Sequence, residues 1–166
     1  WALTLSYSTF GYVAYIFFSW FFIYQDAVRG LDLKSSALYG MLPFIAMATA
    51  SPLGGWISDV LTARYGKRIG RCGVAVVGIG FAAIFIALGT QVASPEIASI
   101  VLAGGAGALY LAQSSFWSVS ADLAGSSAGT VSGVMNMGAQ IGGAVTASLT
   151  PWIAGNYGWT ASFLTA

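Results

Sequence analysis

The sequence predicts an all-α integral membrane protein, because long apolar runs alternate with short polar segments. Charged residues make up 7% of the 166 residues and hydrophobic residues 57%, whereas a water-soluble domain usually carries about a quarter charged residues. As a helix, about 20 apolar residues cross the roughly 30 Å hydrocarbon core of a bilayer. The lipid bilayer is therefore the expected environment of nearly the whole chain.

Measured against that length, the uncharged runs predict a bundle of six membrane spans. The last run contains about ten residues, which is too few to cross a bilayer, and the chain begins at Trp1 inside an apolar run. We therefore expect one transmembrane domain over residues 1–166 that is a fragment at both ends. The predicted spans are Trp1 to Tyr24, Ser36 to Ser58, Arg71 to Gln91, Ile97 to Ala121, Ala128 to Thr150, and Tyr157 to the end.

The basic residues predict how the spans are oriented. The loop at residues 59–71 holds Arg64, Lys67, Arg68 and Arg71 against a single acid, whereas the loop at residues 26–34 balances acids and bases. Lys and Arg in short loops favour the cytoplasmic side. We therefore expect the 59–71 loop to be cytoplasmic.

The residue types in the spans exclude most enzymatic chemistry. The chain has no histidine and one cysteine, so zinc and haem sites lack ligands and no serine has a histidine base. No Asp, Glu, Lys or Arg lies in the interior of a predicted span. The near-neutral net charge of +1, without interleaved aromatic and basic residues, does not indicate nucleic-acid binding. We expect no enzyme activity, no cofactor and no bound metal.

Polar residues at mid-membrane depth are the candidate binding groups. At 1.5 Å rise per residue they fall in the middle third of the membrane, and within each span they recur at helical spacing. An amide there needs a partner or a wet cavity, because an unpaired polar group in hydrocarbon is costly. For Asn136 the alternative is a hydrogen bond between helices, and for Tyr12 and Tyr15 it is core packing. The candidates are Asn136, Gln140, Ser114, Trp117, Tyr12 and Tyr15.

Glycines crowd two of the spans. Such small residues let helix backbones approach closely where lipid provides no hydrophobic drive for association. We expect tight packing, or sliding, at these positions. They are Gly104, Gly105 and Gly107 in the fourth span, and Gly129, Gly133, Gly138, Gly142 and Gly143 in the fifth.

The loop after the second span carries a specific pattern. It reads Gly-Trp-Ile-Ser-Asp from Gly55, followed by Arg-Tyr-Gly-Lys-Arg from Arg64. This resembles the cytoplasmic loop motif of the major facilitator superfamily, roughly G-x-x-x-D-x-x-x-x-R-x-G-x-R. Residues 10–21 and 133–143 resemble the seventh and eleventh helices of its anion:cation symporter family. The resemblance implies a carboxyl-terminal half, helices seven to twelve with the last cut short, built as a 3+3 inverted repeat.

The resemblance also implies a function. It points to secondary active transport by alternating access, with proton-coupled symport of a small organic anion such as a sugar acid, in a bacterial inner membrane. Asn136, Ser114 and Trp117 resemble substrate ligands of that family. The cationic anchor and the proton-coupling residue are then expected in the missing amino-terminal half. The alternatives are a superfamily transporter or exporter of another cargo (a drug, a lipid or a neutral solute) and a non-transport membrane scaffold.

The same loop is expected to act as a gate. Asp59 ends a helix, where its carboxylate opposes the negative helix terminus and needs a partner such as Arg64 or Arg68. In the superfamily this cluster resembles a latch that closes the cytoplasmic side; alternatively, the charges only set the topology. Asp122 is expected to cap or flank the fifth span, with a second gate contact as the alternative. The residues assigned to the gate are Asp59, Arg64, Arg68, Gly55 and Gly66.

Overall fold

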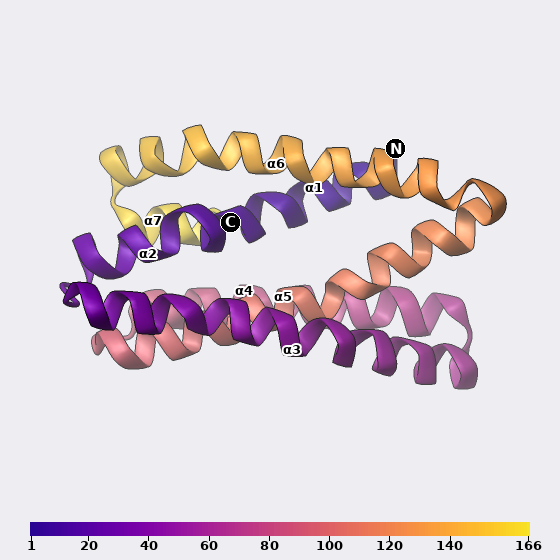
Figure 1. The fold of residues 1–166 in the computed structure, drawn as a ribbon, viewed down its shortest axis with the longest axis horizontal. Helices are drawn as coiled ribbons and strands as arrows, with labels where there is room; N and C mark the ends of the chain where they lie inside the picture. Colours follow the sequence, from indigo (N-terminus) through magenta and orange to yellow (C-terminus); the bar gives the residue numbers. More distant parts are fainter.

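The fold is a bundle of long helices that lie roughly along one axis (Figure 1). The computed structural model describes residues 1–166 apart from the side chain of Ala27, and all the secondary structure in this described part is helical. The prediction of an α-helical protein is confirmed. The elements are α1 (Ala2–Tyr15), π-helical η1 (Ile16–Trp20), α2 (Phe21–Ile23), π-helical η2 (Tyr24–Val28), α3 (Leu33–Tyr65), π-helical η3 (Arg68–Gly73), α4 (Val74–Gln91), α5 (Pro95–Ala124), the short 3-10 turn η4 (Gly125–Ser127), α6 (Ala128–Tyr157) and α7 (Trp159–Leu164).

The predicted count of six spans is not confirmed. Three helical stretches are long and apolar enough to cross a membrane: Leu33–Tyr65, Arg68–Gln91 and Pro95–Tyr157, of which the last contains both α5 and α6. The segment at residues 2–28 is helical throughout but alternates between α and π geometry, and α7 has 6 residues. The structure therefore contains five long helical segments and one short terminal helix.

Local sequence signals set the helix ends. The Asp32 side chain accepts hydrogen bonds from the backbone amides of Lys34 and Ser35 at the start of α3. Ser94 does the same for Ile97 at the start of α5. Such residues satisfy backbone donors that have no partner within the helix. At its other end α3 stops at Gly66, whose φ of 84° lies in the left-handed region that glycine tolerates best.

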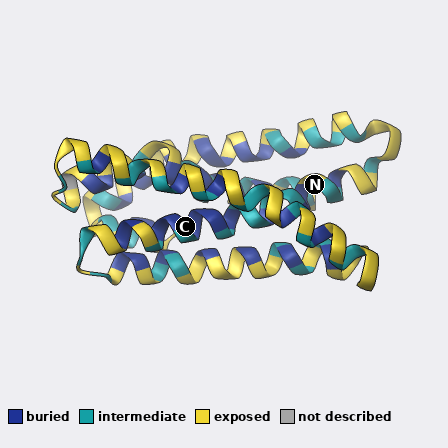
Figure 2. Ribbon diagram, turned by 60° about the horizontal axis from the view of Figure 1, so that its bottom comes forward, coloured by how far each residue is buried: buried dark blue, intermediate teal, exposed yellow. Residues whose placement is uncertain are grey.

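The helices pack as two groups that meet along the middle of the bundle. One group pairs α1 with α6, and in the other α3 and α4 both pack along α5 (Figure 1). Between the groups, Tyr7 and Phe10 of α1 pack with Leu109 and Phe116 of α5 and Met135 of α6. Exposed positions lie mainly on the outward faces (Figure 2) and include many large apolar side chains. Exposed apolar surface of this extent is unfavourable in water and favourable in contact with the lipid chains of a bilayer.

Glycine allows α1 and α6 to come into backbone contact. A Cβ built at Gly142 would overlap the carbonyl oxygen of Ser8 and lie 2.8 Å from the backbone nitrogen of Tyr12. In contrast, a Cβ at Gly129 or Gly133 meets no atom within 4 Å. The expectation of glycine-mediated packing therefore holds for the middle of α6 and not for its first turns.

We predict that Gly142→Ala destabilises the bundle by about 1 to 3 kcal/mol, because an added methyl in a filled contact forces the helices apart. Gly133→Ala is the matched control on the same helix: its methyl enters open space and gains helix propensity. Thermal unfolding of the two variants in detergent measures the difference. Equal melting temperatures would contradict the assigned contact.

Candidate functional site

A polar contact between α1 and α6 joins two of the predicted site residues. The Tyr15 hydroxyl donates a hydrogen bond to Oε1 of Gln140 at 2.5 Å. Asn136 lies one turn earlier on α6 and is half-buried. Within the described part of the chain its side-chain amide has no hydrogen-bond partner, so the interhelical bond considered for this residue is not found there.

A second polar cluster centres on Tyr7, which sequence reasoning missed. The Tyr7 hydroxyl accepts hydrogen bonds from Nε1 of Trp117 at 3.0 Å and from Nε2 of Gln113 at 3.4 Å. Oγ of Ser51 donates to Oε1 of Gln113 at 3.4 Å, so the cluster joins α1, α3 and α5. Trp117 is still 41% exposed. Gln113 could have been found from its spacing, four residues before Trp117 and hence on the same helical face.

Aromatic rings connect the two polar clusters. From Tyr7 the path runs through Phe10 and Tyr110 to Phe18 and then Tyr15, with ring centroids 4.9 to 6.3 Å apart at each step. Rings at this spacing form favourable aromatic pairs. A path of aromatic rings through α1, η1 and α5 thus links the Tyr7 cluster to the contact between Tyr15 and Gln140.

Two further candidates have structural contacts. Tyr12 packs against the buried core; its carbonyl oxygen accepts a hydrogen bond from Oγ1 of Thr146 at 2.8 Å, while its buried hydroxyl has no partner among the described residues. The Ser114 hydroxyl donates to the Leu111 carbonyl within α5. The structure therefore brings Tyr15 and Gln140 together directly, while it does not bring Tyr12 or Ser114 into hydrogen-bond contact with another candidate.

A charge cluster lies at the end of the bundle where η3 connects α3 to α4. Its centre is Arg71, whose side chain is 14% exposed. Its NH1 group donates to Oδ1 of Asp59 at 2.6 Å and to Oγ of Ser58 at 3.0 Å. The expected pairing of Asp59 with Arg64 or Arg68 is therefore wrong for this structure. Both helices extend into the predicted loop, and this brings Arg71 back against Asp59.

Asp122 of α5 completes the cluster. Its carboxylate accepts from Nζ of Lys67 at 2.8 Å and lies 3.5 Å from Nε of Arg71. Of the two expected positions, Asp122 flanks the next helix and does not cap it, because α5 continues to Ala124 and the residue before α6 is Ser127. The hydrogen bond from Lys67 holds the pKa of Asp122 below its ordinary value despite partial desolvation. The pair therefore stays charged at neutral pH and is lost only as the pH falls through that lowered pKa.

The two glycines of the loop motif have different surroundings. Gly66 forms the turn between α3 and η3. A Cβ built at Gly55 would lie 3.7 Å from Cβ of Ser114, an ordinary contact, whereas one at the neighbouring Gly54 would overlap the Leu111 carbonyl. Close packing of α3 on α5 therefore depends on Gly54.

Comparison with known proteins identifies the family. Residues 1–147 match the family model described as Major Facilitator Superfamily. The chain belongs to this superfamily. It is accordingly an integral membrane protein of a transporter family, and its homologues are transporters rather than enzymes.

Several curated relatives of this superfamily member are named for anions. A probable sulfoacetate transporter of Cupriavidus necator is 35% identical over 147 residues, covering 88% of the chain and 34% of the relative. The chloroplastic ascorbate transporter of Arabidopsis thaliana is 29% identical, covering 100% and 31%. The hexuronate transporter of Bacillus subtilis is 29% identical, covering 95% and 38%. The chain thus spans about a third of the length of these relatives.

We predict that Arg71→Gln lowers stability more than Lys67→Gln does. Arg71 contacts Asp59, Asp122 and Ser58 from a mostly buried position, and loss of charge-assisted hydrogen bonds costs about 1 to 3 kcal/mol. Lys67 is 68% exposed and makes one ion pair, which solvent screens. Thermal unfolding in detergent compares the two. A larger loss of stability for Lys67→Gln than for Arg71→Gln would show that the cluster does not depend mainly on Arg71.

Proposed function

We propose that the chain is the carboxyl-terminal half, helices seven to twelve with the last cut short, of a proton-coupled symporter for a small organic anion such as a sugar acid. The relatives named for sulfoacetate, ascorbate and hexuronate support this class of substrate. The pairing of helices across the bundle is compatible with a half-domain built as a 3+3 inverted repeat. A bacterial inner membrane, with the 59–71 loop in the cytoplasm, is the proposed location.

The proposal that this half contacts the substrate rests on the uncharged polar face of α1, α5 and α6. Asn136 has no partner among the described residues, Gln140 is exposed, and Trp117 presents an exposed ring. Amide and indole groups suit the hydroxyls and ring of a sugar acid, and an apolar site with few polar groups is typical of small-molecule binding. Ser114, Tyr12 and Tyr15 complete the proposed contacts.

The missing half completes the transport mechanism in this proposal. A carboxylate or sulfonate needs a cationic partner, and proton coupling needs a titratable group in the pathway. The polar face contains no Asp, Glu, Lys or Arg among its described residues. We therefore place the cationic anchor and the coupling residue in the amino-terminal half, against which this half rocks about a mid-membrane site.

The charge cluster is the proposed cytoplasmic gate. Arg71 ties the end of α3 to α5 through Asp59 and Asp122, so separating these helix ends must break its ion pairs. A cluster that exists in one state and not in the other biases the equilibrium between them. Arg64 and Arg68 have no ion pair among the described residues, so their part in the gate stays a prediction of the resemblance.

Asn136→Ala tests the proposed site. Losing one hydrogen-bond partner should weaken binding of the best substrate among glucuronate, ascorbate and sulfoacetate by about 1 to 3 kcal/mol. The melting temperature should change little, since Asn136 holds no other helix in the described structure. Isothermal titration calorimetry on the full-length protein measures the affinity. Asn156→Ala, an exposed position at the end of the same helix, is the matched control.

The opposite pattern would identify Asn136 as a structural residue. Unchanged affinity together with a clearly lower melting temperature would assign it to helix packing and remove it from the site. Trp117 gives an independent check: Trp117→Phe keeps the ring and loses the donor to Tyr7, so it should weaken binding less than Trp117→Ala. Equal losses would show that the ring does not contact substrate.

A further inference from the structure

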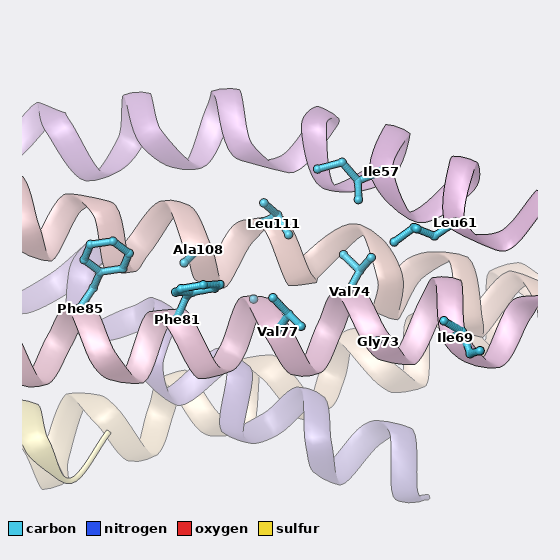
Figure 3. A pocket seen from close by; sticks show the side chains of 11 residues that line it. Ile57, Leu61, Ile69, Gly73, Val74, Val77, Phe81, Phe85, Ala108 and Leu111 are labelled. Atoms are coloured by element: carbon cyan, nitrogen blue, oxygen red, sulfur yellow. The ribbon is translucent and has the colours of Figure 1, made fainter. Parts of the chain in front are cut away.

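The outer side of the bundle carries an apolar groove that the proposed function does not use. It runs along α4 with α3 as its other wall and α5 as its floor, and has a volume of about 610 Å³ (Figure 3). All of its lining residues are apolar or glycine. Ile57 and Leu61 line the α3 wall, Phe81 and Phe85 line the wall formed by the middle of α4, and Leu111 lies on the floor.

Helix packing explains why the groove exists. Both α3 and α4 pack extensively on α5 but only slightly on each other, so a furrow stays open between them. Phe81 and Ile69 on its wall are more than half exposed. An apolar hollow at membrane depth has to be filled by something apolar, because empty space loses dispersion contacts and water makes no hydrogen bonds with its walls.

Two unpaired cations lie at one end of this groove. Arg64 follows Leu61 by three residues in the last turn of α3, on the face that lines the groove. Arg68 begins η3 and directly precedes Ile69, the first lining residue of that segment. Both arginines are exposed, and neither forms an ion pair in the described part of the chain.

We infer that this groove binds an anionic phospholipid from the leaflet that contains the 59–71 loop. One acyl chain lies between α3 and α4 on the apolar floor, and Arg64 and Arg68 hold the headgroup phosphate where the helices leave the hydrocarbon. The lining residues Ile69 and Phe85 are sixteen residues apart, so this wall is about 24 Å long at 1.5 Å rise per residue, which is long enough for an acyl chain that crosses one leaflet of about 15 Å. Arginine suits this role because its planar guanidinium group can donate two parallel hydrogen bonds to the oxygens of one phosphate.

Lipid binding to the full-length protein in detergent tests the inference. Native mass spectrometry with dioleoyl phosphatidylglycerol, and with phosphatidylcholine of the same chains, gives the occupancy of each lipid. Replacing both arginines, Arg64→Gln with Arg68→Gln, should weaken phosphatidylglycerol binding about tenfold or more. Phosphatidylcholine binding should weaken much less, because its choline cation already neutralises the charge of its phosphate. An unchanged preference for the anionic lipid would overturn the headgroup assignment.

Two glycines, Gly73 at the end of η3 and Gly80 in α4, test the acyl-chain position. A Cβ at Gly73, which lines the groove, or at Gly80, which does not, meets no atom within 4 Å, so both positions accept a larger side chain. Gly73→Leu should fill the groove and reduce phosphatidylglycerol occupancy severalfold, and Gly80→Leu should not. Equal occupancy in both variants would mean non-specific lipid contact. A change of oligomeric state in Gly73→Leu alone would make the groove an interface between copies; either result overturns the inference.

Discussion

Close contact between helix backbones is the constraint on which the rest of the structure depends. In a bilayer, helices gain little from hiding apolar surface from each other, so the pairs that form are those whose backbones can meet. Gly142 permits this between α6 and α1, and Gly54 permits it between α3 and α5. The polar contacts follow from these pairings. Tyr15 lies beside Gln140 because α1 lies on α6, and Ser51 lies beside Gln113 because α3 lies on α5.

The bilayer also separates the chemistry of the chain by depth and by face. Uncharged hydrogen-bonding groups lie on α1, α5 and α6. In the hydrocarbon core such groups are stable only if they contact a hydrogen-bonding partner or a water-filled cavity. The ion pairs of Arg71 lie at the helix ends, and the Arg71 side chain itself is 14% exposed. Apolar side chains and glycine line the groove between α3 and α4. Each region therefore suits a different class of ligand or contact.

Sequence reasoning predicted the elements well because the thickness of the bilayer limits where helices begin and end. The four middle spans each overlap an observed helix, and Tyr15 and Gln140, both proposed from depth and spacing, make direct contact. It failed where helices extend into the predicted 59–71 loop. With α3 continuing to Tyr65 and η3 starting at Arg68, Arg71 rather than Arg64 or Arg68 meets Asp59. Nor could it find the bond from Trp117 to Tyr7, since residues so far apart in the chain meet only through tertiary packing.

We propose that this polar face belongs to a proton-coupled transporter of an organic anion. Uptake of radiolabelled glucuronate by proteoliposomes containing the full-length protein, with and without an imposed pH gradient, tests it most directly, with glucose as the uncharged control of similar ring size. We expect glucuronate to accumulate against its gradient when the inside is alkaline, and we expect that glucose does not. Glucuronate uptake that ignores the pH gradient, or accumulation of glucose to the same level, would contradict it.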